Sequence, residues 1–148
     1  MEKSATHIDT IAKTCIAGRL RLINRVVTKI YDDALRPFGV KISQGNILIL
    51  TGKMGVASPV KVCEYLQLDI STLSRNVELM RKKGWLEEVA GEDARSHPFR
   101  LTKEGKRLID KVIPAWDKAQ AEAKELLGHD FVSLLNIAAK RASESNRA

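Results

Sequence analysis

Residues 66–88 have the sequence LQLDISTLSRNVELMRKKGWLEE, and this stretch decides the fold. Its apolar residues recur at the spacing of one helical face, which predicts an amphipathic helix from Ile70 to about Lys83. Asp69 is expected to cap the start of this helix, and Gly84 closes it after a cationic last turn that suits the helix dipole. The apolar stripe consists of Ile70, Leu73, Val77 and Met80.

The face opposite this stripe carries short polar side chains and one arginine: Ser71, Thr72, Ser74 and Arg75. Short side chains let a helix come deep into the major groove of DNA, and an arginine reaches a guanine edge or a phosphate. We therefore predict these four residues as major-groove contacts. A second interpretation is that Ser and Thr near a helix start only cap the helix.

The elements on both sides of this helix predict a winged helix-turn-helix. Upstream, Ser58 and Pro59 begin a short helix that ends near Leu66, and a tight connection follows. Downstream, Trp85–Val89 and Pro98–Leu101 have the pattern of two strands around a charged loop, which predicts a β-hairpin. A short helix, a tight turn, a second helix and a two-stranded wing make up the winged helix-turn-helix arrangement.

The loop of the predicted hairpin carries Asp93 and Arg95 in alternation. An arginine at a loop tip can enter the minor groove, where a narrow A·T tract attracts its charge. An aspartate two residues earlier can hold the guanidinium by a bidentate pair. We expect Arg95 to contact DNA and Asp93 to support it, with a solvated charged turn as the alternative.

Long helices are predicted at both ends of the chain. Apolar residues recur at helical spacing over Ile8–Leu35, which predicts one helix about 40 Å long at about 1.5 Å per residue. A further helix is predicted over Lys103–Leu127, capped by Thr102, and a last one, capped by Asp130, ends near Ala142. An apolar stripe of this length exceeds what a core of this size can cover, so a second chain is expected to bury part of it.

The order of the elements predicts a mainly α (α+β) fold in one domain that spans residues 1–148. Residues 7–36 and 103–142 are the expected dimerisation helices, and residues 40–102 the winged helix-turn-helix DNA-binding lobe. This lobe is expected to begin with a helix that Ser43 caps and that runs to about Gly52.

The charge of the chain favours an anionic partner. Its 148 residues include 25 Lys and Arg against 18 Asp and Glu, a net charge of +7. This excess suits nucleic acid or an anionic membrane surface and does not separate them. No apolar run approaches the roughly 20 residues that span a bilayer, and the polar first ten residues are unlike a secretory signal. With two cysteines, too few for a disulfide scaffold, we expect a cytoplasmic, reduced protein without a membrane partner.

Four stretches of the chain resemble the MarR (multiple-antibiotic-resistance regulator) family. They are LRPFGVKISQGNILIL at 35–50, the stretch at 66–88, EDARSHPFRLTKEGKRL at 92–108, and PAWDKAQAEAKELLG at 114–128. The helix at 66–88 and the Asp-x-Arg wing, at the correct mutual spacing, are the specific part of this resemblance.

The resemblance implies a two-fold dimer with interleaved first and last helices, which binds a palindromic operator, usually as a repressor. It also implies release from DNA by a small phenolic or lipophilic effector in the cleft between dimer helices and DNA lobe, whose lining residues stay unassigned. Position by position, Ser71, Thr72, Ser74 and Arg75 become major-groove contacts, Arg95 the minor-groove contact and Asp93 its support. Ile70 departs from the family, since many relatives have a polar or basic residue there.

Two alternative functions have requirements of their own. A winged-helix module that binds protein would need an exposed apolar patch on the helix from Ile70. An oxidant sensor would need a reactive Cys15, but Cys15 lies on the apolar stripe, two turns into the predicted first helix, and only Arg19 could supply a nearby charge. We therefore expect Cys15 to be a buried structural thiol. We expect no cofactor, metal site or enzymatic activity, because His7, His97 and His129 have no metal-ligand spacing and no nucleophile or phosphate-loop motif is present.

Overall fold

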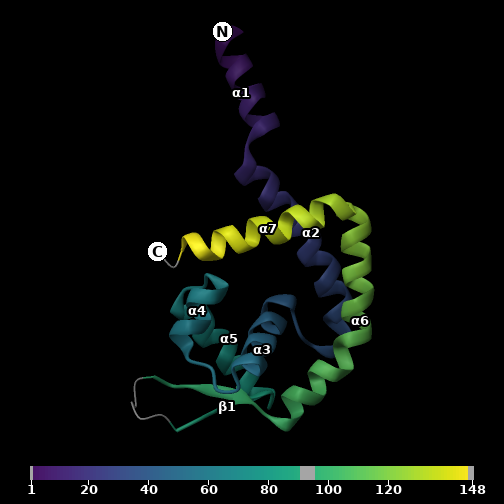
Figure 1. Cartoon of the computed structure of the whole chain (residues 1–148). Helices are drawn as coiled ribbons and strands as arrows, with labels where there is room; N and C mark the ends of the chain where they lie inside the picture. Colours follow the sequence, from purple (N-terminus) through teal and green to yellow (C-terminus); the bar gives the residue numbers. More distant parts are fainter. Residues whose placement is uncertain (1, 91–95, 147–148) are drawn as a thin grey trace.

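The computed structural model describes residues 2–90 and 96–146, which are mainly helical with one small sheet (Figure 1). The central lobe contains three helices and two strands in the predicted order. They are α3 (Ile42–Met54), α4 (Pro59–Leu66), α5 (Ile70–Lys82), β1 (Leu86–Glu88) and β2 (Phe99–Leu101). The strands pair antiparallel, with Leu86 opposite Leu101 and Glu88 opposite Phe99. The prediction of a winged helix-turn-helix is confirmed.

The core of this lobe is apolar and draws on every one of its elements. Each such side chain contributes about 1.5–3 kcal/mol when it leaves water. The fully or almost fully buried side chains are Ile47, Leu48, Val62, Leu73, Met80, Leu86 and Phe99. The buried stripe of α5 therefore holds this helix in the core, against α4 and β1.

The start of α3 differs from the prediction. We expected Ser43 to cap it, but the helix begins at Ile42. Two side chains satisfy the backbone N–H groups there: Asp32 Oδ1 accepts from the Ile42 amide at 2.8 Å, and Gln44 Oε1 accepts from the Lys41 amide at 3.2 Å. The first of these acceptors comes from ten residues upstream, which a local pattern does not reveal.

The prediction of a single N-terminal helix is wrong. The chain forms α1 (Glu2–Thr14) and α2 (Ile16–Leu35), separated by Cys15, whose ψ of 112° is extended. The hydroxyls of Thr10 and Thr14 donate to carbonyl oxygens four residues earlier, a pattern that bends helices. Figure 1 shows α1 projecting from the body, so packing does not hold the two helices in line.

The expectation that Cys15 is buried is also wrong for this chain, since its side chain is exposed. Its neighbours on the helix stripe do not pack against the body, and Cys15 stands directly before the first turn of α2 rather than two turns into a helix. Cys63, by contrast, lies partly buried against the core, and burial raises the pKa of its thiol.

The C-terminal helices frame the lobe. The long helix α6 (Lys103–Leu127) packs along α2, and Tyr31 donates a hydrogen bond to Gln120 between them. The predicted cap of α6 is present, with the Thr102 hydroxyl accepting from the Gly105 amide at 3.0 Å. Figure 1 shows α6 bending along the side of the lobe before α7 (His129–Ser145) crosses above it.

The start of α7 also differs from the prediction. Gly128, with a φ of 84°, ends α6 and directly precedes α7, so Asp130 lies within the first turn and is not the cap. None of the described helices combines the length and the apolar character needed to cross a membrane.

Candidate nucleic-acid interface

The N-terminus of α5 is organised by one carboxylate. Asp69 Oδ1 accepts from the Thr72 amide at 2.8 Å and from the Ser71 hydroxyl at 2.6 Å, while Oδ2 accepts from the Thr72 hydroxyl at 2.7 Å. The Ser71 hydroxyl, then the amide and hydroxyl of Thr72, hold the pKa of the Asp69 carboxyl far below its usual range. The prediction that Asp69 caps this helix is confirmed.

These hydrogen bonds determine what the two hydroxyls can offer a ligand. Because each hydroxyl has a single proton and gives it to Asp69, the oxygens of Ser71 and Thr72 can only accept in this arrangement. In the major groove, acceptors complement the amino groups of adenine and cytosine, whereas a phosphate offers no proton. Both hydroxyls thus take part in capping, and exposed Ser71 retains acceptor sites on the open face of the helix.

Ser74 and Arg75 lie one turn further along α5, and both are exposed. Within residues 2–90 and 96–146, Arg75 makes no hydrogen bond or ion pair, so its guanidinium is available to a ligand. The opposite side of the helix packs on the core and is not accessible to a ligand, because Leu73 and Met80 are buried. The α5 helix thus brings Ser71, Ser74 and Arg75 to one solvent-facing surface.

Ile70 was predicted within the buried stripe and is instead 56% exposed. As the first residue of α5 it precedes the turn that packs on the core, so its side chain faces solvent. An exposed aliphatic group at this end of the helix can contact the methyl group of thymine.

The wing is described only in its two arms. Beyond the ladder, the Val89 amide donates to the Pro98 carbonyl at 2.8 Å, and on the outer face Arg100 pairs with Glu87 at 2.7 Å. Asp93 and Arg95 lie outside the described residues, and their predicted roles stay predictions.

The end of α5 is tied to the segment before α3. Lys83 donates to the Gly39 carbonyl oxygen, and its Nζ lies 4.6 Å from the centroid of the Trp85 ring. This contact connects the C-terminal end of α5 to Gly39, which follows α2 and lies 44 residues earlier in the sequence.

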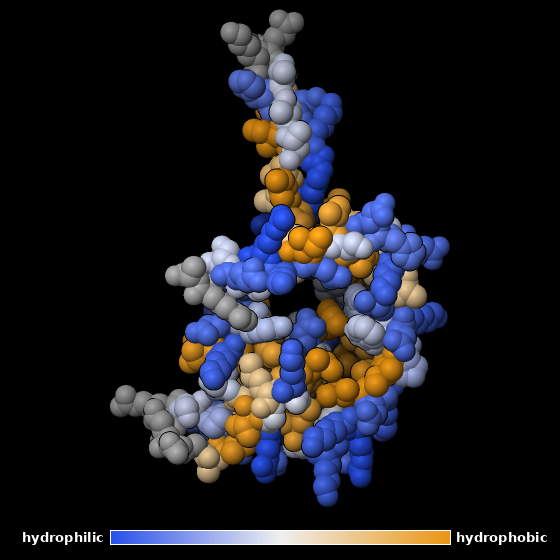
Figure 2. Space-filling view, viewed as in Figure 1, coloured by the Kyte–Doolittle hydropathy of each residue, from blue (hydrophilic) through white to orange (hydrophobic). Residues whose placement is uncertain are grey.

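A cavity of about 590 Å³ lies between α3, α6 and the end of α4. Figure 2 shows apolar side chains gathered in this region, between the lobe and α6. Among the described residues that line the cavity, Lys53 is the single charged one. The apolar lining includes Ile49, Tyr65, Leu108, Val112, Ile113 and Trp116. Because these residues come from distant segments, the sequence pattern does not assign this site.

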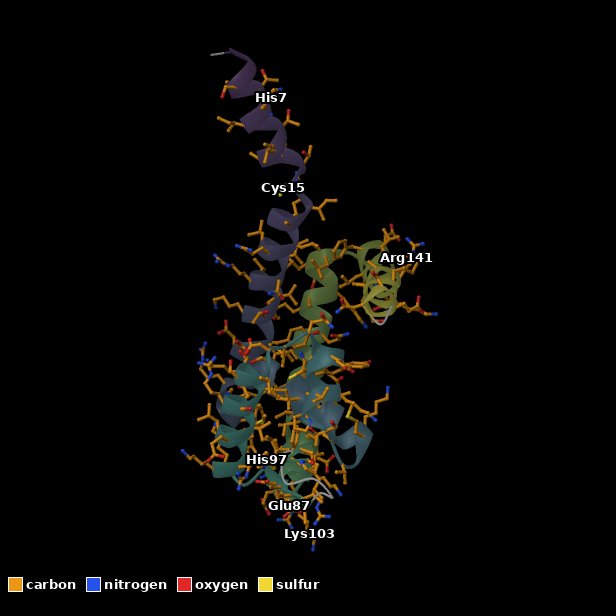
Figure 3. The ribbon with its side chains drawn as sticks, turned by 90° about the vertical axis from the view of Figure 1, so that its left-hand side faces the viewer. His7, Cys15, Glu87, His97, Lys103 and Arg141 are labelled. Carbon is orange, nitrogen blue, oxygen red and sulfur yellow. The ribbon has the colours of Figure 1, made fainter. Side chains whose placement is uncertain are left out.

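Metal binding finds no support in the described part of the chain, where no group of three or more His, Cys, Asp or Glu side chains could hold an ion. Figure 3 shows His7 and His97 at opposite ends of the molecule.

Comparison with known proteins identifies relatives by sequence. No family model matches the chain. The HTH-type transcriptional regulator YwoH of Bacillus subtilis is 27% identical over 88 residues, which span 60% of this chain and 64% of YwoH, slightly under two thirds. The multiple antibiotic resistance protein MarR of Salmonella typhimurium is 25% identical over 121 residues, 79% of this chain and 84% of that protein.

Solved structures show the same fold. A mutant MarR from E. coli complexed with operator DNA has a TM-score of 0.78 at 21% identity, covering 89% of this chain and 96% of that one. CouR from Rhodococcus jostii, bound to p-coumaroyl-CoA, has a TM-score of 0.76 at 20% identity, covering 88% of this chain and 93% of that one.

The buried stripe of α5, its open polar face and the two-stranded wing define a winged helix-turn-helix, an arrangement that proteins use to bind duplex DNA. By sequence the chain is similar to the transcriptional regulators YwoH and MarR, and it has the fold of the solved MarR structures.

Proposed function

We propose that the protein is a homodimeric repressor that binds a palindromic operator and leaves it when a small apolar effector binds. The observation that carries this proposal is the surface of α5, where Ser71, Ser74 and Arg75, which is unpaired among the described residues, face solvent above a buried stripe. In this proposal the first turns of α5 enter the major groove, and Arg95, supported by Asp93, enters the minor groove.

Exposed apolar side chains support a dimer. In one chain they lie along α1, α2 and α7, on the side of the molecule away from the wing (Figures 1 and 2). Extended patches of exposed apolar side chains on a folded chain mark surfaces that another protein covers. A two-fold dimer places two copies of α5 on one DNA face, which calls for half-sites about 34–36 Å apart. The most exposed of these residues are Ile8, Ile11, Ile16, Leu22 and Leu134, each 62–75% exposed.

The cavity between α3 and α6 supports the effector. Its apolar lining suits an aromatic or lipophilic molecule, and Lys53 at its edge suits an anionic group such as a carboxylate or phenolate. The neighbour CouR, which shares the fold, was solved with p-coumaroyl-CoA. An occupant here would press on Leu48 of α3 and Leu66 of α4, both within the lobe that carries α5.

A protein-binding module is the second candidate, and α5 does not favour it. Ile70 and Leu79 are both about half exposed. They are nine positions apart, and at about 100° per residue they point to opposite sides of the helix, so they form no continuous patch.

Selection from a random pool of DNA duplexes tests the proposed function. The wild-type protein is expected to enrich a palindromic sequence, and a footprint of the enriched duplex should show two protected half-sites. Aromatic carboxylates added to the complex should shift part of the DNA to the free state. If no sequence is enriched at physiological salt, the assignment as an operator-binding repressor is wrong.

A further inference from the structure

We propose that Glu88 positions the wing relative to α5. We further propose that protonation of His97 strengthens its contact with Glu88 and thereby strengthens DNA binding. The inference rests on the proposed DNA-binding function and adds a regulatory input to it. It concerns a chain of three side chains, Arg81 on α5, Glu88 on β1, and His97 just before β2.

The two oxygens of Glu88 reach to different elements. Glu88 Oε2 lies 3.6 Å from Arg81 Nη1, and Oε1 lies 2.7 Å from His97 Nδ1. Arg81 also pairs with Glu78 on its own helix at 3.2 Å. Through one carboxylate, the last turns of α5 are therefore linked to both arms of the wing.

His97 occupies the point where the two arms separate. Glu88 pairs with Phe99 in the ladder, and one more backbone hydrogen bond, from Val89 to Pro98, precedes the loop. His97 has a φ of 40°, an uncommon value for a residue with a side chain, and this turn directs its ring back toward Glu88. The contact thus links the two arms of the wing close to the point where they separate.

Among the described residues, few other charged side chains surround the ring. His97 borders a hollow of about 310 Å³ between α4, α5 and the wing. The charged groups that line this hollow are Glu78 and Arg81 from α5 and Glu88 from β1, while α4 contributes Pro59. On the opposite face of the hairpin, Glu87 is paired with Arg100. Glu88 is therefore the acidic partner that meets the imidazole directly.

Histidine is the side chain whose charge changes with pH in the physiological range. The hydrogen bond to His97, followed by the charges of His97 and Arg81, holds the pKa of the Glu88 carboxyl below its usual range. Glu88 thus stays ionised wherever a histidine titrates. The ion pair is complete below the imidazole titration and is lost as pH rises through it, so DNA affinity is expected to be higher at lower pH.

The exposure of the His97 and Glu88 side chains determines how much their ion pair can change DNA affinity. The side chains of His97 and Glu88 are 67% and 42% exposed, so water weakens their attraction. Exposed ion pairs change an equilibrium by roughly two- to five-fold. We therefore expect affinity to rise about two- to five-fold between about pH 8 and about pH 6.

Protonated His97 could also act by attracting a phosphate directly, and Glu88→Gln separates the two mechanisms. The glutamine removes the negative charge while His97 still titrates. If His97 acts through Glu88, the pH dependence is lost in Glu88→Gln and in His97→Gln alike. Retention of the pH dependence in Glu88→Gln would mean that the charge on His97 acts on DNA by itself, and the positioning role would be wrong.

The experiment uses the full chain and a duplex that the wild type selects from a random pool, with affinity measured by fluorescence anisotropy at about pH 6 and about pH 8. Glu87→Gln is the matched control, because it removes the neighbouring carboxylate of the same strand but leaves His97 and Glu88 in place. This control should keep the wild-type pH dependence. A His97→Gln variant that keeps it too would overturn the proposal.

A second measurement tests the contact without DNA. The NMR signals of the His97 ring protons are expected to shift in Glu88→Gln and to stay in place in Glu87→Gln. Unchanged signals in Glu88→Gln would show that the two side chains do not meet in solution, which also overturns the proposal. If no duplex is selected at all, it is the DNA-binding function that fails, and the NMR result still reports on the link.

Discussion

Arg75 is the side chain on which the DNA-binding surface can be tested most directly. Its guanidinium is exposed and unpaired within the described residues, so its replacement breaks no hydrogen bond or ion pair among them. Any loss of affinity in Arg75→Ala then reports on DNA. Ser71 and Thr72 differ in this respect, because their hydroxyls are bonded to Asp69 and their removal also disturbs the cap of α5.

Arg75→Ala is expected to weaken operator binding by about 1–3 kcal/mol if the guanidinium reads a guanine. If it contacts a phosphate instead, the loss should be uniform across sequences and the salt slope should fall by about one. Titrations of the selected duplex at several salt concentrations distinguish these outcomes. Arg141→Ala is the control, because Arg141 lies on α7, outside the winged lobe, and Figure 3 shows it well separated from His97. Equal affinities of Arg75→Ala and the wild type would remove Arg75 from the interface.

Cys15 shows where reasoning from single residues stops. It does belong to the apolar pattern, but its expected burial depends on a continuous helix that does not exist. Thr10 and Thr14 are visible in the sequence, and their hydrogen bonds to the preceding turn are the local signal that the helical pattern hides.

At the scale of elements, the first turn of α6 is packed directly on the base of the wing. A Cβ atom built on Gly105 would lie 2.2 Å from the Trp85 carbonyl oxygen and 3.2 Å from a methyl group of Leu101. The Trp85 carbonyl also accepts from the Thr102 amide, so it cannot move away without loss of that hydrogen bond. The close approach of α6 and the wing therefore requires a glycine at this position.

Gly105→Ala is expected to destabilise the protein by about 1–3 kcal/mol, since overpacking outweighs the gain of about 1 kcal/mol in helix propensity. Gly45→Ala is the matched control, because Gly45 also lies within a helix but a Cβ atom there would meet no atom within 4 Å among the described residues. This control should be neutral or slightly more stable. Chemical denaturation at one fixed protein concentration measures both changes. A Gly105→Ala protein as stable as the wild type would contradict the close approach.

The elements of the lobe could be predicted because their signals are local. Asp69, Pro59 and Thr102 lie beside the helices that they begin, and the two strands flank a charged loop. The cavity could not be predicted, because Ile42, Tyr65 and Trp116 meet only when α6 packs beside α3 and α4. The same reason applies to the start of α3, whose amide is bonded by Asp32 from another helix.

At the scale of the whole molecule, one chain leaves its terminal helices without an apolar partner. Light scattering at micromolar concentration is expected to give twice the 16.5 kDa mass of the chain, because in the proposed dimer a second copy covers the exposed residues of α1, α2 and α7. Leu134→Glu and Ile8→Glu place charges in this surface and should favour the monomer. A single species of 16.5 kDa in the wild type would contradict the dimer.

The interruption at Cys15 has a consequence for the lifetime of the protein. Because α1 has 13 residues and projects from the body, it has a length at which an isolated helix is only marginally stable in water. We expect it to hold its shape only while a second copy covers it, so circular dichroism at 222 nm should weaken upon dilution. An unwound terminus is where proteases begin. A cell that makes little of this regulator would then also degrade it faster, and its abundance would fall off steeply below a threshold of synthesis.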